Sequence, residues 1–160
     1  MKKSNNTVSH INKDGNPQMV DVSEKISTVR TATAQSVVQF PPKVFKQLVQ
    51  DDFLSSKGGV FATAIIAGTM AAKRTADLIP LCHPLSLSQI KIEIEKGNNL
   101  LVIKATIKCE GKTGVEMEAL TAAAVTALTV YDMCKALSHD IIIAETRLLE
   151  KKGGKSDFTK

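Results

Sequence analysis

The sequence has no tryptophan, and its five Phe and one Tyr make up only 4% of the chain. Small and branched aliphatic side chains must therefore build the core. The three cysteines, at positions 82, 109 and 134, form no Cys-x-x-Cys pair, which argues against a disulfide framework or a zinc knuckle and indicates reduced thiols in the cytoplasm. No apolar run is long enough to span a membrane, and residues 1–17 lack the apolar segment of a signal peptide.

The charge balance is basic. The 160 residues carry a formal net charge of +5, with a pI of about 9.1, which favours anionic ligands. Aromatic residues do not interleave with Lys and Arg clusters, so no nucleic-acid-binding motif is present. The length suits one domain. We expect a flexible arm over residues 1–16, a single domain over residues 17–156 and a C-terminal tail over residues 157–160.

Hydrophobic periodicity predicts four strands and three helices. The strands are expected at 29–40, 90–95, 101–107 and 140–149, and the helices at 43–51, 60–79 and 115–137. Without the first short helix the order is βαββαβ, the ferredoxin-like arrangement. The sequence therefore predicts an α+β fold, with helices on one face of an antiparallel sheet and an extra N-terminal helix. The other face must find a cover or stay polar. Gly68 marks either a close helix contact or an ordinary tolerated glycine.

The segment from Asp77 to Leu85 is the most informative part of the chain. Pro80 and Pro84 end a helix and hold Cys82 and His83 in a defined loop, because proline fixes φ and donates no backbone hydrogen bond. A thiol and an imidazole in such a loop suggest a site. The alternative is a buried turn with a capped histidine.

Three further segments are rich in functional groups. Lys57-Gly58-Gly59 combines a cation with a backbone free to approach a ligand, although this motif is weak and more often marks a solvated loop. Gly111 to Glu118 is a glycine-rich loop that opens a helix, which suits an anion; Glu118 could bind a base edge, or the acids there could simply match the helix dipole. Asp132 and Lys135 share a helix face, as a surface pair or as a proton-transfer pair.

Together these segments predict several lysines, one histidine, two or three carboxylates and no metal cluster. The basic Lys151-Lys152-Gly153-Gly154-Lys155 stretch adds cations suited to a polyphosphate, unless it is only a solvated end. This set of groups favours acid–base chemistry on a phosphorylated substrate over redox chemistry.

Long stretches of the chain resemble the cyclic pyranopterin monophosphate synthase family, also known as the molybdenum cofactor biosynthesis protein C family. The resemblance covers about residues 10–156. Its motifs occur in the family's order: Met19-Val20-Asp21-Val22-Ser23, Ala71-Ala72-Lys73-Arg74-Thr75, 77–85, 111–121, Tyr131-Asp132-Met133-Cys134-Lys135 and Gly153-Gly154-Lys155-Ser156.

The resemblance implies a lyase. It would convert 3′,8-cyclo-7,8-dihydroguanosine triphosphate, the product of a radical-SAM GTP cyclase, to cyclic pyranopterin monophosphate with release of pyrophosphate. The family is ferredoxin-like and forms a homohexamer, a trimer of dimers, with its site at a subunit interface. No resident cofactor is implied, and the sequence leaves open whether Mg²⁺ travels with the triphosphate. A cytoplasmic enzyme without nucleic-acid or membrane partners is expected.

The resemblance also assigns residues. Asp132 matches the proposed catalytic aspartate, and Lys57 and Lys135 match essential lysines; we interpret these lysines as acid–base groups, Asp132 as tuning Lys135, and His83 as orienting a phosphate or a proton. The remaining matches are substrate-binding segments and basic positions expected near the triphosphate. They are Leu81, Cys82, His83, Met117, Glu118, Arg30, Lys73, Lys151 and Lys155.

The chain departs from the family at three places. Gly59 and Ile65 stand where many members have Asp and Arg, and Ser156 is followed by Asp157 without the usual Gly. The missing Asp and Arg could be an ion pair lost together, or the Arg could bind phosphate. The alternative to an enzyme is a catalytically silent binding or scaffold homologue.

Overall fold

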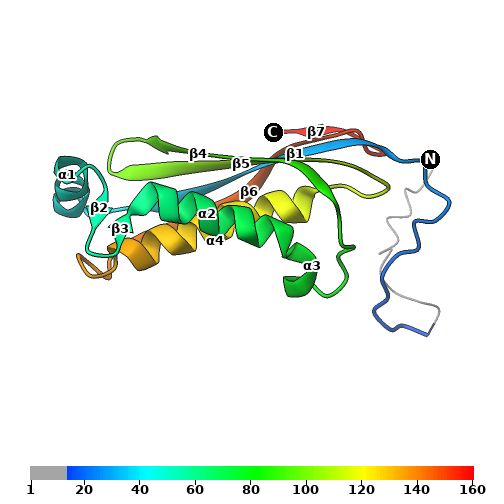
Figure 1. Ribbon diagram of the computed structural model, residues 1–160, viewed down its shortest axis with the longest axis horizontal. Helices are drawn as coiled ribbons and strands as arrows, with labels where there is room; N and C mark the ends of the chain where they lie inside the picture. The colour runs from blue at the N-terminus through cyan, green and yellow to red at the C-terminus, as the bar shows by residue number, and fades with distance from the viewer. Residues whose placement is uncertain (1–13) are drawn as a thin grey trace, which may run out of the picture.

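The computed structural model describes residues 14–160, which form a mixed α+β fold (Figure 1). One five-stranded sheet has the order β4-β5-β1-β6-β7, with every neighbouring pair antiparallel, and β2 and β3 form a separate small hairpin. The elements, in chain order, are β1 (Thr28–Gln39), α1 (Pro42–Gln50), β2 (Leu54–Ser55), β3 (Gly58–Gly59), α2 (Val60–Lys73), α3 (Thr75–Leu78), β4 (Leu87–Lys96), β5 (Leu100–Gly111), α4 (Glu116–Cys134), β6 (Ile142–Lys152) and β7 (Phe158–Thr159).

Helices α2 and α4 lie side by side on one face of the sheet (Figure 1). Their contact is close because the facing side chains are small. A methyl group added at Gly68 of α2 would meet Thr126 Oγ1, would lie 2.8 Å from Ile92 Cδ1 and would lie 2.9 Å from the Ala122 carbonyl oxygen. The close helix contact expected at Gly68 is therefore confirmed.

Alternation along β1 sends one set of side chains to the helices and the other set outward. Ala32, Ala34, Ser36 and Val38 are buried, while the residues between them are only partly covered. In the described part of the chain no helix covers the outer face. That face carries ion pairs, among them Lys91–Glu93 at 2.8 Å and Lys104–Glu95 at 3.1 Å, so its surface is polar in the single chain.

The helix expected over 60–79 is divided in the structure. α2 ends at Lys73, Arg74 has φ −112° and ψ 16°, and the short α3 follows. The Thr75 hydroxyl donates to the carbonyls of Ala71 and Ala72, at 3.3 and 3.0 Å. Such a bond from a threonine hydroxyl to a carbonyl one turn back often bends a helix.

The C-terminal end folds back on the sheet. β6 continues to Lys152, the chain turns at Gly153, which has φ +82°, and β7 pairs with the end of β6. Residues 157–160, expected as a tail, thus contain a strand. The expected arm, residues 1–16, lies outside the described residues except for its last three. Between residues 14 and 160 no helix is long and apolar enough to cross a membrane.

Candidate functional site

Functional side chains lie at both ends of helix α4. Met117 and Glu118 are in its first turn, and Asp132 is in its last. At 1.5 Å per residue, the fourteen residues from Glu118 to Asp132 separate the two ends by about 21 Å. The residues singled out from the sequence therefore fall into two groups within one chain.

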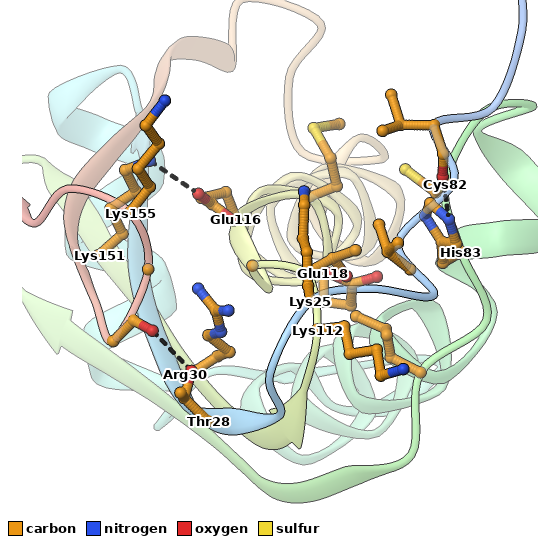
Figure 2. Close-up of a pocket in the computed structure, with 18 of the residues that line it drawn as sticks. Lys25, Thr28, Arg30, Cys82, His83, Lys112, Glu116, Glu118, Lys151 and Lys155 are labelled. Carbon is orange, nitrogen blue, oxygen red and sulfur yellow. Dashed lines mark hydrogen bonds and ion pairs between the residues drawn. The ribbon is translucent and has the colours of Figure 1, made fainter. Parts of the chain in front are cut away.

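The first group surrounds a cavity of about 730 Å³, called the basic pocket here. Its walls are residues 20–26 (the N-terminal strap), the Leu81-Cys82-His83 loop, the start of α4 and the end of β6 with the turn that follows. Figure 2 shows Lys151, Lys155 and Glu116 on one side of this pocket and Cys82 and His83 on the other, with Glu118 between them.

Glu118 is a buried carboxyl group on the floor of the basic pocket. Its residue is only 4% exposed, and this burial raises the pKa of its carboxyl group. Burial, followed by the nearby Glu118, also raises the pKa of the Cys82 thiol. Glu116 faces solvent more and pairs with Lys151 at 3.2 Å. A carboxyl group kept from water can bind the N–H edge of a heterocycle, because it has no competing solvent.

His83 is held by the N-terminal strap. Its Nε2 lies 2.9 Å from the Val20 carbonyl oxygen. Since a carbonyl can only accept, Nε2 carries the hydrogen and Nδ1 is the remaining ring nitrogen. The His83 ring is therefore held by a backbone carbonyl and also lines the pocket. The two alternatives expected from the sequence, a capped histidine and a site histidine, apply together.

Cations converge on the basic pocket from four segments. Arg30 Nε donates to the Gly111 carbonyl at 3.2 Å, and Lys112 Nζ donates to the Ser23 carbonyl at 2.6 Å. These bonds fix the positions of two charged side chains, Arg30 and Lys112, at the pocket wall. The six cationic residues along its walls are Lys25, Arg30, Lys112, Lys151, Lys152 and Lys155. They outnumber the two carboxylates, so the pocket suits a polyanion.

The second group, called the lysine–aspartate cluster, lies at the other end of α4. Asp132 accepts from Lys57 Nζ and from Lys135 Nζ, each at 2.7 Å, one on each carboxylate oxygen. The bond from Lys135, and then the bond from Lys57, lower the pKa of Asp132 to about 2. The same carboxylate raises the pKa of Lys135. The Asp132 carboxylate therefore stays ionised from neutral pH down to about pH 2, and it favours the protonated form of Lys135.

The β2–β3 hairpin carries Lys57 to this cluster. Ser55 Oγ accepts from the Lys57 N–H and donates to the Gly58 carbonyl, both at 3.1 Å. Gly58 has φ +107°, which glycine adopts without strain. Before the hairpin, Phe53 is buried although its φ is +54°. A buried ring and a closed turn hold the loop, which is therefore more than a solvated connection.

The structure brings together most but not all of the residues expected to bind substrate. Arg30, Leu81, Cys82, His83, Met117, Glu118, Lys151 and Lys155 all line the basic pocket. Lys73 does not: it is exposed at the end of α2. Sequence reasoning overlooked Lys25 as a pocket residue, and it noted Lys112 and Lys152 only as parts of a loop and of the basic stretch. Nothing in the local sequence marks Lys25, since the strap comes to the pocket only through the fold.

Across residues 14–160 no three His, Cys, Asp or Glu side chains are grouped so that they could hold a metal ion. The donors of the basic pocket are mainly ammonium and guanidinium groups, which bind anions rather than cations.

Comparisons with known proteins agree on one family. A family model described as the MoaC family matches residues 19–154. A cyclic pyranopterin monophosphate synthase from Xanthomonas oryzae pv. oryzae is 55% identical over 152 residues, which cover 94% of this chain and 92% of that protein. One from Xanthomonas campestris pv. campestris is 54% identical and covers 98% and 96%. The molybdenum cofactor biosynthesis protein 1 of Dictyostelium discoideum is 51% identical over 95% of this chain and 27% of its own length.

Proposed function

Because the chain belongs to the MoaC family, we propose that it is a cyclic pyranopterin monophosphate synthase of molybdenum cofactor biosynthesis. It would convert 3′,8-cyclo-7,8-dihydroguanosine triphosphate to cyclic pyranopterin monophosphate and pyrophosphate, as a cytoplasmic lyase. The observation that carries this proposal is the basic pocket, which joins six cations to one buried carboxyl group. The cations would bind the triphosphate, and the buried carboxyl group would bind the N–H edge of the guanine-derived ring.

In this proposal the basic pocket binds the substrate, and the lysine–aspartate cluster transfers protons. Arg30, Lys151 and Lys155 face the triphosphate, and Glu118 faces the ring edge. His83 orients a phosphate or a proton from the pocket wall. Lys57 and Lys135 give and take protons during ring opening, ring closure and phosphate cyclisation, and Asp132 keeps Lys135 protonated between turnovers. No step needs a change in oxidation state.

The two groups must meet for this chemistry, although about 21 Å of helix separates them in one chain. We propose that a second copy supplies the missing half, within a homohexamer built as a trimer of dimers. A twofold axis across α4 would place the basic pocket of each copy beside the lysine–aspartate cluster of the other. Exposed apolar side chains on α2 and α4 support such a contact: Ile66, Met70 and Leu128 are 61%, 48% and 56% exposed.

The strand order supports a ferredoxin-like fold. Without β7 and the small hairpin the order is β4-β5-β1-β6. With the two helical crossovers packed on one face, this matches a split βαβ arrangement with α1 as an addition.

A turnover assay tests the proposed activity. Pyrophosphate and pterin product are measured from the cyclised guanosine triphosphate for the wild type, Lys57→Ala and the exposed-lysine control Lys46→Ala. The expected result is turnover in the wild type and the control, with a loss of about 10²–10⁴ fold in Lys57→Ala. A wild type that binds the substrate without converting it would favour a silent binding homologue instead.

A further inference from the structure

The turn between β6 and β7 forms one wall of the basic pocket. Lys151, Lys152, Gly153, Gly154 and Lys155 all line the pocket. A methyl group added at Gly154 would lie 3.0 Å from Arg30 Nη1. The tip of this turn, residues 153–156, is therefore in contact with the guanidinium group from β1, and the two form one cationic surface.

Short-range bonds fix the tip against the sheet. The Gly153 N–H donates to Asp157 Oδ1 at 3.0 Å, and the Gly153 carbonyl accepts from Thr28 Oγ1 at 2.8 Å, the bond drawn beside Thr28 in Figure 2. A methyl group at Gly153 would meet the Val29 carbonyl oxygen. Both polar groups of Gly153 are thus occupied, and its backbone cannot turn without losing one of these bonds.

Beyond the tip, β7 anchors the other end of the turn. Phe158 pairs with Lys151 and Thr159 with Glu150, and the Lys160 N–H donates to the Leu149 carbonyl at 3.0 Å. Asp157 is the residue between this anchor and the tip. It does not line the pocket itself, and its charge opposes that of an anionic ligand.

We propose that Asp157 is a positioning residue, which sets the tip at residues 153–156 as a polyphosphate clamp over Arg30. This inference rests on the proposed function for the identity of the substrate, although not for the class of ligand. The carboxylate acts through its bond to the Gly153 N–H. Without it, the tip loses its fixed place beside Arg30, and ordering the tip and Lys155 around a ligand would cost part of the binding free energy.

The sign of the effect separates positioning from charge. If Asp157 acted only through the electrostatic field of its charge, removing it would tighten the binding of an anion in the pocket. If Asp157 positions the tip, Asp157→Ala weakens binding in spite of the added positive charge. Asp157→Asn keeps an oxygen acceptor for Gly153 and loses the negative charge, so it should bind as tightly as the wild type or more tightly.

The experiment measures tripolyphosphate binding by calorimetry on the full chain. The variants are Asp157→Ala, Asp157→Asn and Asp51→Ala, an exposed acid outside the pocket that controls for net charge. We expect about three- to tenfold weaker binding for Asp157→Ala only, as fits the loss of one charge-assisted hydrogen bond at an exposed site. In turnover the same variant should raise KM with kcat nearly unchanged.

Three results would overturn the inference. They are equal or tighter binding by Asp157→Ala, equal weakening by Asp157→Ala and Asp157→Asn, and absence of tripolyphosphate binding by the wild type. Thermal melting of each variant shows whether the fold is retained, and Asp157→Asn keeps the test informative if Asp157→Ala is unstable. A protein that binds tripolyphosphate as expected but shows no turnover would refute the proposed function and leave the clamp standing.

Discussion

Mixing two impaired variants should restore activity, measured at a substrate concentration too low for the weakened pocket, if each site is shared between two copies. Lys57→Ala removes a member of the lysine–aspartate cluster, and Arg30→Ala removes a cation of the basic pocket. In a mixed pair, one composite site then carries both changes and the other carries neither. The second site joins the intact pocket of the Lys57→Ala copy to the intact cluster of the Arg30→Ala copy.

The size of the recovery follows from the geometry. With random exchange, half of the pairs are mixed and half of the sites in those pairs are intact, so about one quarter of wild-type activity returns. The assay is pyrophosphate release after the two variants are co-expressed in equal amounts. The double variant mixed with inactive Lys57→Ala is the control, because none of its composite sites is intact.

The structural reasoning would be refuted by activity that stays at the sum of the two single variants. Such a result would mean that the two ends of α4 reach one substrate within a single chain, against the separation of about 21 Å along the helix. It would also remove the reason for an antiparallel contact through Ile66, Met70 and Leu128.

Other predictions concern the cluster and helix α2. Asp132→Asn removes the charge that raises the pKa of Lys135, so the alkaline limb of the pH–rate profile should move to lower pH. Gly68→Ala should lower the free energy of unfolding in urea by about 2 kcal/mol. The added methyl group would lie 2.9 Å from the Ala122 carbonyl oxygen, so overpacking should cost near the upper end of its usual range of about 1 to 3 kcal/mol, and Ala recovers about 1 in helix propensity. Gly59→Asp should raise that free energy by about 0.5 to 1 kcal/mol, since Gly59 precedes α2 with extended geometry, no side-chain cap and open space around a Cβ.

Each of these has a clear contrary outcome. An alkaline limb that does not move in Asp132→Asn would mean that Lys135 is not the titrating acid. Gly68→Ala as stable as the wild type would mean that α2 and α4 can separate at no cost. Unchanged stability in Gly59→Asp would mean that the new carboxylate does not cap α2.

Much of the fold could be predicted because its signals are local. The alternation over Ile90, Ile92 and Ile94 predicts a strand over 90–95 with one buried face. The observed strand β4 contains this range and runs from Leu87 to Lys96. The break at Arg74 could not be predicted from periodicity, because it lies in the backbone of a single residue, which an apolar pattern does not report. β7 was missed because two residues carry no periodic pattern and pair only through the turn at Gly153.

The site was harder to predict because it is assembled by tertiary structure. Chemistry-bearing motifs such as Cys82-His83 and Met117-Glu118 do meet in one pocket. Lys25 reaches the same pocket from the N-terminal strap, which no local signal places there. Lys73 looked equivalent to the other basic positions in sequence, but it lies exposed at the end of α2 and does not line the pocket.

The departures from the family pattern are also clearer in three dimensions. Gly59 precedes α2 and Ile65 lies within it, and six helical positions turn the chain by about 240° in excess of one full turn. Side chains at positions 59 and 65 would point in different directions. This argues against an ion pair between the Asp and the Arg that many family members have there.

The most direct test of the account separates binding from chemistry. Substrate affinity at equilibrium and the single-turnover rate are measured for Arg30→Ala and Lys57→Ala. We expect at least about tenfold weaker binding in Arg30→Ala, since a charge-assisted contact is lost. We also expect near wild-type affinity but a rate reduced by about 10²–10⁴ fold in Lys57→Ala. The opposite pattern, with Lys57→Ala losing affinity and Arg30→Ala losing only rate, would contradict the division between the basic pocket and the lysine–aspartate cluster.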